Sequence, residues 1–287
     1  RERFGTDLLE APLDAWPPSY PNVAQARLLL EHGVRAPIVA ILTRIGTVEG
    51  FGAMIRNAPL PDFSSVFVED VSGTAMAHLG RGLFEAHARD EAGFGAEGGH
   101  RQMWFAARDI AFENPVTEDE TERMMQRMGI AGPSGGGPLA APARALSPDV
   151  PAELELLIER MVRLLLIEVS AFHTFAWAEE LLADDDLVAG DGEAARLVAC
   201  IRTDETPHVE YLRTALTEMR DRTVVGESGR RYPGTELVGR LFERAMADSL
   251  GPRRAVLVEQ TDAEVRGALD GRRDAKDLFA EFKRLTS

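Results

Sequence analysis

Apolar residues recur every three to four positions along most of the chain, which is the spacing of an amphipathic helix. No run of residues shows a convincing strand-like alternation of polar and apolar side chains. The pattern predicts helices over these ranges: 22–34, 37–57, 65–91, 96–113, 118–129, 152–183, 192–222, 234–249, 253–269 and 273–285. We therefore expect an all-α fold that forms a single domain over residues 1–287.

One long interruption divides this helical pattern. The segment 131–151, "AGPSGGGPLAAPARALSPDVP", is rich in glycine and proline and is not compatible with a helix. Loops of this length are uncommon inside compact domains, and a long crossover between two helical hairpins is one reason for them. We therefore expect a four-helix bundle with its crossover here, and additional helices at the N- and C-terminal ends.

The stretch 164–178, "LLLIEVSAFHTFAWA", carries a single acidic side chain, Glu168, in surroundings typical of a hydrophobic core. A buried, unpaired carboxylate is costly and usually takes up a proton. A basic partner, a raised pKa or a metal ion would make it tolerable. Arg163 and Arg202 are the candidate partners if Glu168 is only a structural carboxylate.

The next helix carries two more polar groups at core positions. Its apolar stripe is interrupted at Glu205 and His208, which are three residues apart and share one helix face. A reversal near 183–193, "ADDDLVAGDGE", brings Glu168 level with this pair. Because two neighbouring carboxylates repel each other, we expect a cation between them, and a divalent metal ion suits that role.

A Glu followed 37 residues later by the Glu of "DETPH" (204–208) resembles the second half of the non-haem di-iron carboxylate proteins of the ferritin-like superfamily. The resemblance implies that Glu168, Glu205 and His208 bind metal, and that Asp204 orients a metal-bound histidine. It implies two iron ions, with manganese or a mixed Mn/Fe pair as alternatives, since such ligands do not discriminate sharply between these metals. Pro207 should bend the helix between the ligands.

The family also requires a half-site before the crossover. Glu97 and His100 are three residues apart, and Glu69, 28 residues before Glu97, would be the single glutamate. This choice needs a chain reversal near 79–82, which conflicts with one helix over 65–91. The alternatives to Glu69 therefore stay open: Glu85, His87 and Glu91. The resemblance covers approximately residues 65–222.

His173 lies five residues after Glu168, so the two side chains are not expected on the same helix face. We interpret His173 as a core histidine with a hydrogen-bond partner. The alternative is that it assists the metal site, either as an extra ligand or as a group that orients a ligand.

Composition limits the classes of partner. The net charge of −15, from 32 basic and 47 acidic residues, argues against nonspecific binding to nucleic acid or to an anionic membrane. A single cysteine, Cys200, excludes an internal disulfide and a thiolate zinc cluster, which fits a cytoplasmic protein. No apolar run is expected to reach the ~18 residues of a membrane span, and no signal peptide is visible.

These features favour an O2-activating non-haem di-iron oxygenase or oxidase, of the hydroxylase or N-oxygenase type, acting on a small organic substrate. It would require O2 and an electron donor, and would be a monomer or a homodimer. Two other functions remain open: a ferritin-like ferroxidase or iron-binding protein, and a metal-free helical binding protein.

Overall fold

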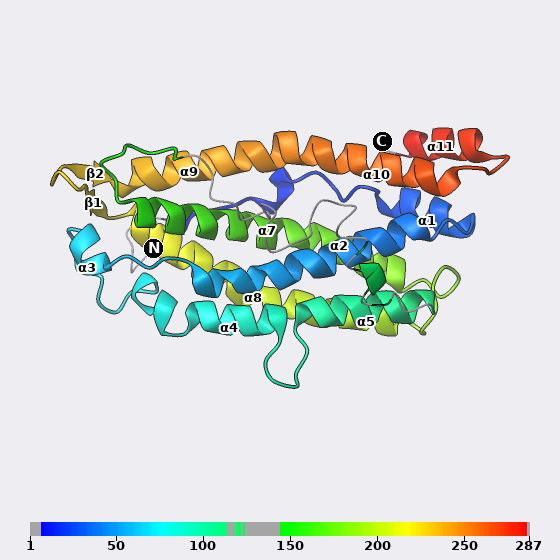
Figure 1. Cartoon of the computed structure of the whole chain (residues 1–287), viewed down its shortest axis with the longest axis horizontal. Coiled ribbons are helices and arrows are strands. Elements are labelled where there is room, and N and C mark those ends of the chain that lie inside the picture. Colours follow the sequence, from blue (N-terminus) through cyan, green and yellow to red (C-terminus); the bar gives the residue numbers. More distant parts are fainter. Residues whose placement is uncertain (1–6, 114–116, 118, 122, 124–143, 286–287) are drawn as a thin grey trace.

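The computed structural model describes residues 7–113, 117, 119–121, 123 and 144–285, and over these residues it confirms the all-α class (Figure 1). The helices form an elongated bundle whose long axis follows the longest helices. Of the expected helix 118–129 and the crossover 131–151, most residues lie outside the described ranges.

The two longest helices, α7 (Ala152–Leu182) and α8 (Glu193–Arg220), pack against each other as an antiparallel hairpin. Their bounds lie within two residues of those expected from the sequence. Glu153 and Glu155 in the first turn of α7 stabilise the positive end of its dipole. Helix α8 remains continuous through Pro207, although proline provides no backbone N–H for the helix.

A second layer consists of α2 (Ala36–Gly52), α4 (Leu83–Ala92) and α5 (His100–Phe112). Helices α4 and α5 follow one another along one edge of the bundle, and the loop 93–99 between them projects outward (Figure 1). Helix α2 packs against both, and α5 packs against α8. This layer places the two ends of the 93–99 loop directly beside the central hairpin.

The prediction of one helix over residues 65–91 is wrong, because a turn interrupts the helical pattern. The chain forms a short α3 (Phe63–Val66) and a 3-10 segment η3 (Met76–Arg81) before α4 begins. Between them Asp70 accepts a hydrogen bond from the backbone of Ser72, and Gly73 has a φ of 69°. The carboxylate of Glu218 then accepts hydrogen bonds from the backbone N–H groups of Ala75 and Met76.

The remaining elements cover the bundle. They are α1 (Val23–Glu31), the long helical stretch α9 (Gly234–Asp248), η4 (Ser249–Arg253, a π-helical turn) and α10 (Arg254–Leu269), then α11 (Ala275–Arg284). Short 3-10 turns, η1 (Leu13–Ala15) and η2 (Ala53–Asn57), complete the N-terminal part. A small antiparallel sheet, β1 (Thr223–Val225) with β2 (Arg231–Pro233), was not expected from the sequence.

The apolar core is divided into two clusters along the bundle axis. One contains Val169 of α7 and Leu212 of α8, and the other contains Phe175 and Ile201 of the same helices. The polar side chains of α7 and α8 singled out in the sequence lie at the boundary between these clusters. The core thus has a polar layer with apolar packing above and below it.

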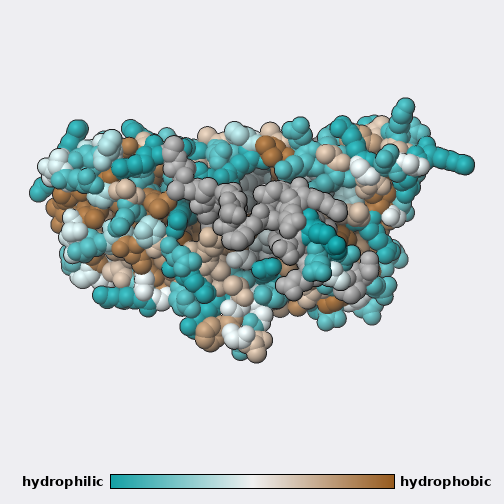
Figure 2. Space-filling model, viewed as in Figure 1, coloured by the Kyte–Doolittle hydropathy of each residue, from teal (hydrophilic) through white to brown (hydrophobic). Residues whose placement is uncertain are grey.

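The segment Ala36–Asn57 is long and apolar enough to cross a membrane by length and composition alone, contrary to the expectation that no such run exists. Here it forms α2 and η2, which pack against α4. The face of the molecule in Figure 2 is largely hydrophilic where it is described, with scattered hydrophobic side chains.

Candidate metal centre

Seven side chains from five helices converge in the polar layer between the two apolar clusters. Helix α2 provides Glu49, α4 provides His87 and Glu91, α5 provides His100, α7 provides Glu168, and α8 provides Glu205 and His208. All are buried except Glu49, whose side chain is 9 % exposed. They form two groups with the geometry to hold a metal ion, and Glu91 belongs to both groups.

The first group consists of His87, Glu91, Glu168 and His208. Nε2 of His87 lies 3.4 Å from Oε1 of Glu168 and 3.6 Å from Oε1 of Glu91. Nδ1 of His208 lies 3.5 Å from the same Glu91 oxygen. The two imidazole rings stack at 3.9 Å between centroids.

The second group consists of Glu49, Glu91, His100 and Glu205. Nδ1 of His100 is the common point: it lies 2.9 Å from Glu205 Oε1, 3.6 Å from Glu91 Oε1 and 3.9 Å from Glu49 Oε2. The other oxygen of Glu205 lies 2.7 Å from Nδ1 of His208, which links the two groups.

These separations match those of ligands around a shared ion. Two ligand atoms at about 2.1 Å from one metal, at right angles, lie ~3 Å apart. Within the described residues, several buried atoms here have no hydrogen-bond partner: His87 Nε2, both carboxylate oxygens of Glu91 and Nε2 of His100. His100 Nδ1 and Glu205 Oε1 lie 2.9 Å apart but without the geometry of a hydrogen bond. Buried polar atoms are normally satisfied, so this concentration of unsatisfied atoms indicates a cation site.

The second nitrogen of each histidine faces a polar group outside the two clusters. Nε2 of His208 lies 3.1 Å from Asp90, Nε2 of His100 lies 3.8 Å from Asp204, and Nδ1 of His87 lies 3.2 Å from the hydroxyl of Tyr211. Metal-bound histidines usually have such a partner, which fixes the tautomer and the ring orientation. His208 and His87 thus direct one nitrogen inward and the other to a group that holds the ring, whereas Nε2 of His100 faces Asp204 from beyond hydrogen-bond distance.

The buried carboxylates repel one another when no ion is bound. Burial, followed by the charges of Glu91 and Glu205, raises the pKa of Glu49 well above its ordinary value. Burial together with the same neighbours raises the pKa of Glu168 in the same way. Burial would also raise the pKa of Glu205, but its contacts with His100 and His208 outweigh burial and lower it.

The histidines differ according to their neighbours. Burial would lower the pKa of His100, but Glu205 and Glu91 raise it to about 11. The pKa of His208 is likewise raised, by Glu205 and Glu91 against the effect of burial. Burial and the neighbouring His208 lower the pKa of His87 well below its ordinary value. Protons on the carboxyl groups and histidines therefore balance part of the carboxylate charge. Two divalent ions would replace these protons, and their combined charge would balance that of the four carboxylates.

Glycines allow the upstream helices to approach closely. A Cβ atom at Gly52 of α2 would lie 2.8 Å from the Glu91 side chain. A Cβ atom at Gly99 would lie 2.3 Å from the backbone nitrogen of Gly93 and 2.5 Å from the Asp90 carbonyl oxygen. The 93–99 loop therefore closes on itself through backbone contacts, and it returns the chain so that α5 begins with His100 next to Glu91.

A cavity of about 220 Å³ borders the carboxylate side of the centre. Glu49, Glu91 and Glu168 form its acidic end, and most of the remaining wall is apolar. A separate recess on another side is lined by the 93–99 loop, Asp90, Asp204 and His100. The centre is thus accessible from an apolar cavity and from a polar recess.

The structure brings together four of the side chains expected to bind metal: His100, Glu168, Glu205 and His208. It does not bring Glu69 or Glu97 to them. The Glu69 carboxylate accepts hydrogen bonds from the backbone and hydroxyl of Thr223, and the backbone of Glu97 pairs with Phe94 in the projecting loop. Two of the alternatives named for Glu69, His87 and Glu91, lie at the centre.

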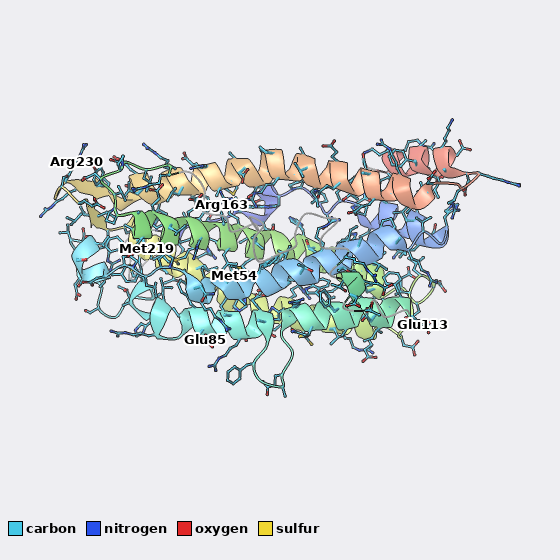
Figure 3. All side chains as sticks on the ribbon, in the orientation of Figure 1. Met54, Glu85, Glu113, Arg163, Met219 and Arg230 are labelled. Carbon is cyan, nitrogen blue, oxygen red and sulfur yellow. The ribbon has the colours of Figure 1, made fainter. Side chains whose placement is uncertain are left out.

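The third alternative, Glu85, lies at the outer edge of α4 and pairs with Arg89 (Figure 3). The structural partners considered for Glu168 are engaged elsewhere, since Arg163 pairs with Glu159 and Arg202 with Glu179.

Of the two groups expected beside the ligands, Asp204 faces His100. His173 is away from the two clusters, where its Nε2 contacts the carbonyl oxygen of Leu13.

Sequence reasoning missed Glu49, which lies before the range 65–222 assigned to the metal-binding bundle. The signal was present: Glu49 is the single acidic residue in the apolar stretch 36–55. This is the same feature that drew attention to Glu168, but no histidine lies at helical spacing from Glu49 to complete a recognisable pattern.

Comparison with known proteins gives no relative: no protein-family model matches the chain, and neither a curated protein nor a solved structure matches it.

Proposed function

We propose that this protein is an O2-activating dinuclear metal oxidase or oxygenase, with iron as the preferred metal and a ferritin-like arrangement of its central helices. The observation that carries the proposal is the pair of buried carboxylate–histidine groups sharing Glu91, with the carboxylates of three helices bordering an apolar cavity. A purely structural role does not account for so many unsatisfied buried polar atoms.

The donor set fits iron. Four carboxylates and three imidazoles provide the mixed oxygen and nitrogen donors that Fe(II) accepts. Even if Glu91 and Glu205 each contacted both ions, seven side chains would not fill the positions of two six-coordinate ions, so positions would remain for small molecules. Two iron ions bound here would supply the redox chemistry for reducing O2, and an external donor would supply the electrons. The same ligand atoms are also compatible with manganese.

The chain's own residues have definable tasks around such a centre. Asp90 and Tyr211 hold the rings of His208 and His87 in orientation, and Asp204 faces Nε2 of His100 at 3.8 Å. The apolar wall of the cavity excludes water from the acidic end, which strengthens electrostatic interactions there. Glu49 and Glu168, which belong to the two groups and border the cavity, would hold metal at the side of the centre that faces the cavity.

Anaerobic reconstitution with Fe(II), followed by exposure to O2, tests this function. We expect the purified chain to bind two iron ions and to oxidise them with consumption of O2. Metal analysis and an oxygen electrode provide the two measurements. An Asp184→Asn variant, which changes a carboxylate paired with Arg27 far from the centre, should behave as wild type. Failure to retain iron, manganese or zinc would contradict the proposal. Continued iron uptake far beyond two ions per chain would indicate storage.

A further inference from the structure

The cavity beside the metal centre has opposite charges at different parts of its wall. Three carboxylates of the centre line it, and two arginines, Arg160 and Arg253, line it as well. The side chains between these charged groups are apolar: Val48, Phe51, Met54, Ile55, Leu164 and Ile167. Met54, labelled in Figure 3, marks the position of this wall near the end of α2.

Arg160 is the more informative of the two arginines. Its Nη1 donates a hydrogen bond to the carbonyl oxygen of Asn57, whereas its Nε is buried without a hydrogen-bond partner within the described residues. A buried guanidinium nitrogen without a partner is costly. A planar guanidinium offers parallel donors that match the two oxygens of a carboxylate. The arginine is therefore available to bind an anion.

Arg253, in contrast to Arg160, has a carboxylate partner. Its Nε donates to Asp248 at 2.6 Å, so part of its charge is already balanced by a neighbouring carboxylate. It can assist a bound anion, but the residue whose donor lacks a partner is Arg160. This assigns the main anion contact to α7 and a supporting contact to the π-helical turn η4.

The spacing on α7 orients a bound molecule. Arg160, Leu164, Ile167 and Glu168 all line the cavity from one face of this helix. Arg160 and Glu168 are separated by eight residues, which is about 12 Å along a helix. A molecule held at Arg160 would therefore direct its other end along Leu164 and Ile167 towards the metal-binding carboxylates.

We propose that the cavity binds a small carboxylic acid with an apolar body, whose carboxylate is held by Arg160 and whose body extends towards Glu168. The substrate class depends on the proposed function, but the binding itself requires neither metal nor O2. A monocarboxylate suits the cavity better than a more highly charged anion, because the acidic end lies in the same small space.

Binding of octanoate and of octanol, measured by isothermal titration calorimetry on both the metal-free and the zinc-loaded chain, tests the proposal. The two probes share an apolar body and differ in the charged group. We expect octanoate to bind more tightly than octanol in both forms. Equal binding of the two probes would overturn the proposal, as would octanoate binding that requires zinc, since the carboxylate would then be a metal ligand.

The substitution Arg160→Gln should weaken octanoate binding about tenfold or more and leave octanol binding unchanged, because it removes a charge-assisted contact. Arg160→Lys retains the charge without the planar fork and should recover part of the affinity. Arg202→Gln, which alters an exposed arginine paired with Glu179, is the matched control and should bind octanoate as wild type. Thermal unfolding of each variant establishes that it is folded.

The two proposals fail in distinguishable ways. A chain that loads iron and consumes O2, but binds octanoate equally well with Arg160→Gln, overturns the assigned substrate class and leaves the oxidase intact. A chain that binds octanoate through Arg160, but retains no metal, overturns the oxidase and leaves the carboxylate site.

Discussion

The two halves of the metal centre are built by different means. The α7–α8 half provides Glu168, Glu205 and His208 from two long helices that continue well beyond the centre on both sides. The other half uses helices that end close to their ligands. Helix α2 ends at Gly52, three residues after Glu49, and α4 ends one residue after Glu91.

The two halves thus position their metal-binding side chains in two different ways. In the α7–α8 half, helical periodicity alone aligns the ligands, and the apolar packing on both sides fixes their position. In the α2–α4–α5 half, alignment depends on the close approach of backbones at Gly52 and Gly99 and on the return of the 93–99 loop. We therefore expect the first half to tolerate small backbone changes that disrupt the second.

Glu91 is the residue whose loss should have the largest effect, because it belongs to both candidate metal groups. The substitution Glu91→Gln should remove metal from both positions, with a loss of affinity larger than the roughly 10- to 100-fold typical of changing a residue that only orients a ligand. Metal analysis after iron reconstitution measures the result. Glu85→Gln, on the exposed side of the same helix, is the control and should load normally. Retention of two ions by Glu91→Gln would contradict the shared role.

The adjacent glycines Gly98 and Gly99 test whether the α2–α4–α5 half depends on backbone contact. At Gly99 a Cβ atom would overlap the backbone of Gly93 and Asp90, whereas at Gly98 it would meet only the side chain of Gln102, whose Cβ is 3.2 Å away. Gly99→Ala should therefore cost about 1–3 kcal/mol and displace His100, which weakens metal loading. Gly98→Ala should change both properties less.

Thermal unfolding without metal, together with zinc titration, provides the two measurements. Equal behaviour of the two glycine variants would show that the position of His100 does not depend on this contact.

The same contrast explains how much the sequence could predict. Glu168, Glu205 and His208 could be identified because a regular helix converts sequence spacing into spatial proximity. Pro207 did not interfere, since α8 continues through it. The all-α class and most helices were predictable for the same reason.

The upstream ligands depend on information that helical spacing does not contain. His87 and Glu91 are four residues apart on α4, but His100 joins them only because the 93–99 loop folds back on itself. The Glu97–His100 pairing assumed a helix through a segment that forms a loop. Glu69 was selected from an expected helix that the Asp70–Ser72 turn prevents. Glu49 could not be paired with a histidine by spacing, since its neighbours at the centre come from other helices.

The smallest expected effect distinguishes two carboxylates within the α7–α8 half when no metal is bound. Burial and neighbouring carboxylates raise the pKa of Glu168, whereas the contacts of Glu205 with histidines lower its pKa against the effect of burial. A raised pKa means that Glu168 contributes stability below its ordinary pKa of 4.5, and that this contribution is lost as the pH rises through the higher folded value. For Glu205 the sign is opposite: its contribution is present above 4.5 and is lost as the pH falls towards the lowered folded value.

At neutral pH the metal-free Glu168→Gln variant should therefore melt a few degrees above wild type, and Glu205→Gln a few degrees below, since ~1 kcal/mol corresponds to about 2–4 °C in domains slightly smaller than this chain. The advantage of Glu168→Gln should grow as the pH increases above 4.5, whereas the deficit of Glu205→Gln should shrink as the pH decreases below 4.5. Each variant should nonetheless lose metal at the group to which its carboxylate belongs, so zinc should stabilise wild type more than either. Thermal melts across this pH range with a chelator and with zinc measure both effects. Destabilisation of the metal-free chain by Glu168→Gln would mean that this carboxylate contributes to folding without an ion, and the reason for its burial would then lie in the helix packing itself.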